Sequence, residues 1–149
     1  MIFAAPGDTG YDIMLLLHIL TAMVAFAPVF VHPLLANQAG DGGVRGTLMG
    51  LFASNGRRIY APALILSGLL GFGVAGMSDE VYSVGDGWII AAILVWIAQN
   101  GLLHAMVIPG QRAAADGDEA AQQKVSLGEG LIVALLVVQL VLMVFKPGA

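Results

Sequence analysis

Residues 13–36 read IMLLLHILTAMVAFAPVFVHPLLA and contain no acidic side chain, no Lys and no Arg. In helical form, about 20 apolar residues at about 1.5 Å each cross the roughly 30 Å hydrocarbon core of a bilayer. A chain segment in lipid must satisfy its own backbone hydrogen bonds, which a helix does. This stretch therefore predicts a membrane-spanning helix, and with it an integral membrane protein.

Three further stretches have the same character. Because four short strands could not close a barrel, all four are expected to be helices. The N-terminal residues lack Lys and Arg, so they do not read as a signal peptide and the first span is expected to be retained. We predict an all-α integral membrane protein, a single four-transmembrane-helix bundle over 1–149, with spans at about 11–37, 59–77, 88–108 and 127–145.

The composition agrees with this class. Of the 149 residues, 58% are hydrophobic and only 11% are charged, and the mean hydropathy is +0.88. Soluble domains carry about 25% charged residues. So few charges also argue against a disordered chain and against a nucleic-acid-binding protein. The chain has no Cys, which excludes disulfides, thiolate catalysis and iron–sulfur clusters.

The basic residues indicate an orientation. Arg45, Arg57 and Arg58 lie between the first two spans, and Arg112 and Lys124 lie between the last two, so these loops hold five of the six basic side chains. By the positive-inside rule both loops face the cytoplasm and both termini lie outside. We therefore expect a multi-pass protein of the bacterial inner membrane, with the lipid bilayer as its first partner.

The two basic loops are predicted to be partly helical. Residues 38–58 could form a short interfacial helix. Residues 110–130 are expected to continue as helix into water, with a break at Gly117. The second span also carries small residues at steps of four, which let neighbouring helices approach closely. We predict a helix–helix contact along Ala63, Ser67, Gly71 and Ala75.

Histidines are the main candidates for chemistry. We place every charged side chain outside the spans or at their margins, which argues against a carboxylate-based proton-coupled transporter and against a retinal Schiff base. All three histidines, His18, His32 and His104, fall within predicted spans. Ionisable residues in lipid are costly and usually functional.

Their depths suggest pairings around a haem iron, which two axial ligands must face. His18 and His32 are fourteen residues apart, about four turns, and share one helix face. His32 and His104 each lie five residues before the inner end of their span, so they are matched in depth. His18 could instead meet Met77 or Met143. Alternatively, His32 only hydrogen-bonds to carbonyls freed by the nearby prolines.

Four segments together resemble a known family. LLLHILTAMVAF at 15–26 is similar to the first helix of the membrane protoporphyrinogen IX oxidase family and of the related copper-resistance D domain. RRIYAPALILSGLLGFGVAG at 57–76 resembles the second helix of the oxidases. GWIIAAILVW at 87–96 and VLMVFKPGA at 141–149 resemble the start of their third helix and their Lys-Pro ending.

The resemblance implies a four-helix fold and a haem b ligand at His18. In that family a Lys early in the third helix is the expected partner ligand, and Ala92 stands at the matching position here. An Arg expected late in the first helix is also absent, with Leu34 nearby.

The leading hypothesis from sequence is a haem b-binding redox protein of this superfamily, with haem held by His18 or by His32 and His104. The alternatives are a non-catalytic accessory subunit or homo-oligomer within a larger membrane complex and, third, a small permease. No nucleic-acid partner is expected.

Overall fold

The computed structural model describes residues 6–39, 43–79 and 81–148, and the described residues form helices and connecting turns without a strand. Two helical segments, η1 and η2, are single π-helical turns. In chain order the elements are α1 (Thr9–Gln38), α2 (Gly43–Asn55), η1 (Gly56–Tyr60), α3 (Ala61–Gly76), α4 (Gly87–Leu102), η2 (Leu103–Val107), α5 (Ile108–Ala115) and α6 (Glu119–Phe145).

Four continuous rods result, because η1 joins α2 to α3 and η2 joins α4 to α5. The rods run over Thr9–Gln38, Gly43–Gly76, Gly87–Ala115 and Glu119–Phe145, and each is long and apolar enough to cross a membrane. The prediction of four spanning helices is confirmed to that extent. The second and third rods are longer than predicted, since each includes the helix that the sequence placed in a basic loop.

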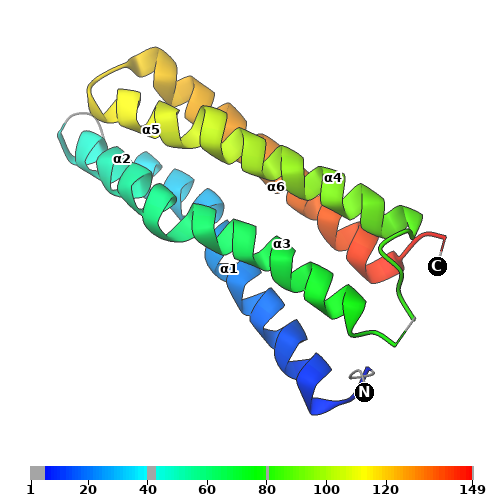
Figure 1. Ribbon diagram of the computed structural model, residues 1–149. Helices are drawn as coiled ribbons and strands as arrows, with labels where there is room; N and C mark the ends of the chain where they lie inside the picture. Colours follow the sequence, from blue (N-terminus) through cyan, green and yellow to red (C-terminus); the bar gives the residue numbers. More distant parts are fainter. Residues whose placement is uncertain (1–5, 40–42, 80, 149) are drawn as a thin grey trace.

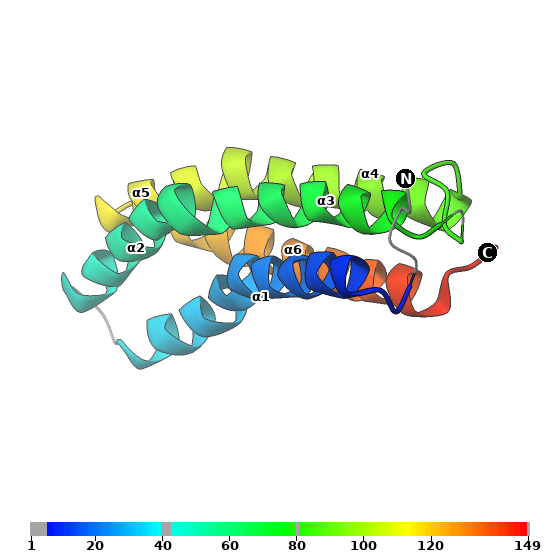
Figure 2. The ribbon, with the colours of Figure 1, turned by 60° about the horizontal axis from the view of Figure 1, so that its bottom comes forward.

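The rods lie in two layers (Figure 1). α1 runs beside α3, and α4 with α5 runs beside α6, while α2 and α5 occupy the end opposite the two termini. We call the end formed by α2, α5 and the start of α6 the basic end, because Arg45, Arg57, Arg58, Arg112 and Lys124 belong to it. In Figure 2 the C-terminal part of α1, which contains both prolines of that helix, turns away from the line of its first part.

The π-helical turns keep one face of each long rod buried. In the third rod Gln99, Leu103, Val107 and Gln111 are all buried, at steps of four residues. Three α-helical turns take about 10.8 residues, so a twelve-residue separation would normally rotate Gln111 well away from Gln99. A π turn takes up one extra residue. The η2 turn therefore returns both glutamines to the same internal face.

The apolar core joins all four rods near their middle. Its buried members are Ala25, Phe26, Val29, Ala61, Leu64, Leu103, Val107, Ile108 and Ile132. Many other large apolar side chains are exposed along the rods, for example Leu94 at 63% and Val144 at 70%. Such an apolar exterior is unfavourable in water and is the surface that a spanning bundle presents to lipid.

The turn between α5 and α6 confirms the predicted break. Gly117 has φ +96°, a left-handed conformation that glycine adopts without steric cost. Asp118 then caps α6, since its side chain accepts a hydrogen bond from the backbone N–H of Ala121.

Candidate functional site

A buried histidine–glutamate pair is the most unusual polar feature of the bundle. Nδ1 of His32, on α1, lies 2.8 Å from Oε1 and 2.9 Å from Oε2 of Glu129, on α6. Both residues are only 3% exposed. The two residues are 97 positions apart in the chain, so the pair joins the first and fourth rods inside the protein.

The remaining polar atoms of the pair also have partners. Nε2 of His32 lies 3.1 Å from the sulfur of Met49 on α2, and its ring packs edge-on against Phe52 at 4.8 Å between centroids. Gln111 on α5 donates its amide N–H to Oε1 of Glu129 at 3.3 Å. Four helices therefore contribute to one buried polar cluster, comprising His32, Met49, Gln111 and Glu129.

These contacts fix where protons can sit. A thioether sulfur only accepts hydrogen bonds, so Nε2 of His32 carries a proton directed at Met49. A hydrogen bond between Nδ1 and the carboxylate requires one further proton, either on the ring or on the acid. In both arrangements the pair as a whole would be uncharged, which is the state that a low-dielectric interior favours.

Glu129 corrects the sequence interpretation. Its place at the margin of the fourth span argued against a buried carboxylate, but in the structure it lies on the inner face of α6, five residues beyond Lys124. A carboxylate is thus buried within the fourth rod, so the argument from sequence against carboxylate-based proton chemistry loses its premise. Gly128, next to Glu129, allows α6 to lie close to η2, since a Cβ on Gly128 would lie 2.9 Å from Val107. α6 approaches η2 too closely there for a side chain.

His18 lies apart from this cluster. Its Nδ1 is 2.7 Å from the carbonyl oxygen of Ser67 on α3, and its ring packs on Gly71, where a Cβ would lie 3.1 Å from Cε1. Two members of the predicted small-residue contact thus touch α1 directly. Ala63 packs beside the core, and Ala75 accepts a hydrogen bond from the hydroxyl of Ser78.

The structure does not bring His32 and His104 together. Both ring nitrogens of His32 are engaged by Glu129 and Met49, whereas His104 is exposed on η2 and lines a surface cleft with Arg57 and Arg112. Although matched in depth, the two histidines face different surroundings. The three histidines therefore occupy three separate sites.

A second set of buried polar atoms continues from the cluster toward the other end of the bundle. Gln99 is 1% exposed and its amide nitrogen has no hydrogen-bond partner among the described residues. The same holds for the side-chain oxygens of Asn100 and Gln139. Buried polar atoms of this kind are commonly satisfied by ordered water.

Two positions carry residues that the oxidase resemblance would not place there. Ala92, where that family has a Lys, is 4% exposed on α4, and Leu34 is 63% exposed on α1. Comparison of the chain with family models, with curated proteins and with solved structures finds no significant match. The superfamily assignment therefore stays a prediction, and the function is argued from the geometry above.

Proposed function

We propose that this chain is a small proton-conducting membrane protein, in which the His32–Glu129 pair holds the proton in transit. The observation that carries the proposal is a 3%-exposed carboxylate bonded to a 3%-exposed imidazole inside a bundle of spanning helices. Chains of Asp, Glu and His inside membranes mark proton relays.

The buried amides support a path for the proton. Gln111 connects Glu129 to the basic end, since it follows the π turn and precedes Arg112. Toward the other end, the unpartnered atoms of Gln99, Asn100 and Gln139 are positioned to hold water. A proton passes from this water to the pair, while the proton already shared there leaves past Gln111 to water at the basic end. Charge and proton number at the pair are unchanged after each passage.

The proposed setting is the bacterial inner membrane with both termini outside, which places the basic end in the cytoplasm. Lys and Arg gather at one end of the bundle, and the apolar exterior fits lipid. Arg45, from α2, donates to the carbonyl oxygen of Ala36, one turn along α1 from His32.

The test uses the purified full chain in liposomes that contain a pH-sensitive dye. With valinomycin and a potassium gradient setting the potential, we expect proton entry well above that of empty liposomes. Glu129→Gln, which keeps the shape of the side chain but cannot ionise, should reduce entry to the empty-liposome rate. The matched control Glu119→Gln removes a carboxylate from the exposed first turn of the same helix and should conduct as wild type does.

Equal entry for wild type and Glu129→Gln, with both proteins eluting as single species, would overturn the proposal. A wild-type rate no higher than that of empty liposomes would overturn it too, and would favour the accessory-subunit or homo-oligomer role. Partners retained in mild detergent would then identify the complex.

Haem b binding at His18 is the second candidate. The Nδ1–H of a neutral His18 ring donates to the Ser67 carbonyl, which leaves the lone pair of Nε2 free. Metal-ligating histidines use this arrangement. The fit covers one axial ligand, because neither of the other two histidines lies beside His18 in the described part of the chain. A bound haem would supply redox chemistry, and His18 would orient it.

An optical spectrum decides this second candidate. Protein from haem-replete cells should show a Soret band, and His18→Ala should lose it while Met23→Ala, a lipid-exposed change on the same helix, should keep it. A colourless wild-type protein would rule out haem.

A further inference from the structure

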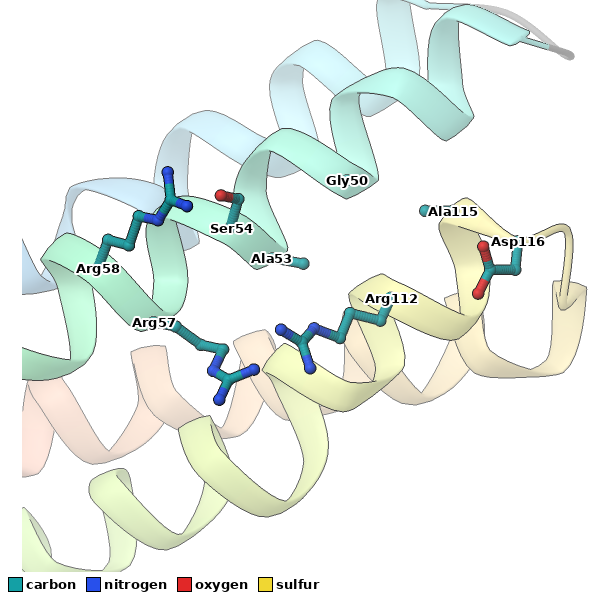
Figure 3. A pocket seen from close by; sticks show the side chains of 8 residues that line it. All are labelled: Gly50, Ala53, Ser54, Arg57, Arg58, Arg112, Ala115 and Asp116. Carbon is teal, nitrogen blue, oxygen red and sulfur yellow. The ribbon is translucent and has the colours of Figure 1, made fainter.

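An open cleft lies at the basic end, between α2 with η1 on one side and α5 on the other (Figure 3). It has a volume of about 560 Å³, and a second hollow of about 520 Å³ adjoins it. Arg57, Arg112 and Asp116 line both, so the two form one groove. The groove lies on the surface, apart from the buried His32–Glu129 pair.

Two guanidinium groups converge in this groove. Figure 3 shows Arg57 from η1 and Arg112 from α5 extending toward each other, while Arg58 extends to the other side of η1. None of the three guanidinium groups makes a hydrogen bond or ion pair with another described residue. With Arg58 directed elsewhere, Arg57 and Arg112 against the Asp116 carboxylate give the groove a net charge of about +1 by the usual charge states.

The floor of the groove is made of small residues. Gly50, Ala53 and Ala115 line it, and a Cβ on Gly50 would lie 3.9 Å from the Cβ of Ala115. A Cβ on Gly46 would lie 3.3 Å from the Ala115 carbonyl oxygen. α2 and α5 therefore approach closely beneath the arginines, which keeps the space above them open. The hydroxyl of Ser54 adds a donor at the rim.

We propose that this groove binds a phosphate group between Arg57 and Arg112. Like charges that face each other repel, so their convergence is favourable when an anion lies between them. Guanidinium forks match phosphate oxygens in pairs, and the two converging arginines supply the positive charge that faces a phosphate bound between them. The phosphate comes from a lipid headgroup or from a soluble phosphate compound. Basic pockets between spanning helices commonly bind anionic headgroups.

The proposal does not depend on proton conduction. Its test therefore measures only the binding of phosphate or of lipid to the chain. One arm titrates inorganic phosphate into the full chain in nanodiscs of neutral phosphatidylcholine, followed by microscale thermophoresis. The other arm adds phosphatidylglycerol to the chain in detergent and counts retained lipids by native mass spectrometry. Binding in the first arm identifies a soluble source, and binding in the second arm alone identifies a lipid headgroup.

Variants give the expected size of the effect. A hydrogen bond to a charged group is worth about 1.5–3 kcal/mol and 1.4 kcal/mol is a factor of ten, so each lost arginine should weaken binding about tenfold or more. Arg57→Gln with Arg112→Gln should therefore weaken it at least about 100-fold. Arg57→Lys with Arg112→Lys keeps the charge but removes the forks, and should weaken binding by a smaller factor.

Lys124→Gln is the matched control, because it removes a positive charge from the same end of the bundle outside the groove. If binding depends on the positions of Arg57 and Arg112, the affinity of Lys124→Gln for phosphate or lipid should stay within about twofold of wild type. An equal loss in Lys124→Gln and in the arginine variants would overturn the proposal, since it would indicate general attraction to a basic surface. Failure of both arms to detect binding to the wild-type chain would overturn it as well. The lysine pair keeps the test valid if the glutamine pair does not fold.

Discussion

Replacing His32 and Glu129 by leucine, singly and together, tests whether they act as one buried pair. Either single change leaves the other group without its partner at 3% exposure. Removing one member of a buried ion pair typically costs about 3–5 kcal/mol. For a chain of this length, 1 kcal/mol lowers the unfolding temperature by about 2–4 °C, so each single variant should lose about 6–20 °C.

The double variant should behave differently. Replacing a whole buried pair by apolar residues is often neutral or stabilising by about 1–4 kcal/mol. Here that gain is offset, because Gln111 loses its acceptor and an unsatisfied buried amide costs about 1–3 kcal/mol. His32→Leu with Glu129→Leu should therefore unfold close to the wild-type temperature, well above either single variant.

Circular dichroism at 222 nm in one detergent measures all four proteins of this cycle. A double variant that loses the sum of the two single losses would refute the reasoning, because additive effects are those of independent sites. Unchanged single variants would refute it equally, since the groups would then be reached by water.

Two further stability predictions follow from close packing and from the π turn. Gly68→Ala should lower stability by about 1–3 kcal/mol and alter tryptophan fluorescence, because the new Cβ would lie 2.2 Å from the Trp96 ring. Gly101→Ala, which meets nothing within 4 Å, should instead raise the unfolding temperature slightly, and a loss there would contradict the packing argument. Deleting Ala105 should convert η2 to α-helix and turn Gln111 by about 100° away from Glu129. Gln111→Leu should then lower the unfolding temperature in the full-length chain but not in the deletion variant; equal effects in both would contradict this role of η2.

The four rods could be predicted because apolar length alone determines them. The uncharged stretch from Ile13 to Ala36 needs no tertiary information to be identified as a spanning helix. The break at Gly117 was equally local, since glycine readily adopts the left-handed backbone found there.

The buried pair could not be predicted in the same way. His32 and Glu129 are 97 residues apart, and nothing near either residue identifies the other. Glu129 also lies in a polar stretch, where average hydropathy places it at the membrane margin. The preceding Gly128 was the available signal, since it allows the close approach of α6 to η2.

The π turns could not be predicted from the sequence either. A 3.6-residue period places Gln99 and Gln111 on different faces, and only the extra residue in η2 brings both inside. The pairing of His32 with His104 by depth failed for a related reason. The depth of a residue along a helix axis does not specify the direction in which its side chain points around that axis.

The lengths of the rods bear on the membranes that this protein can occupy. The second rod has 34 residues, or about 51 Å, against a hydrocarbon layer of about 30 Å. Its surplus lies at α2, where Gly, Ser and Arg accompany the apolar residues. A thicker bilayer would cover more of α2 and a thinner one less, each at a modest cost per ångström. In a bilayer, the extra length of α2 would thus let the bundle tolerate variation in thickness at its basic end.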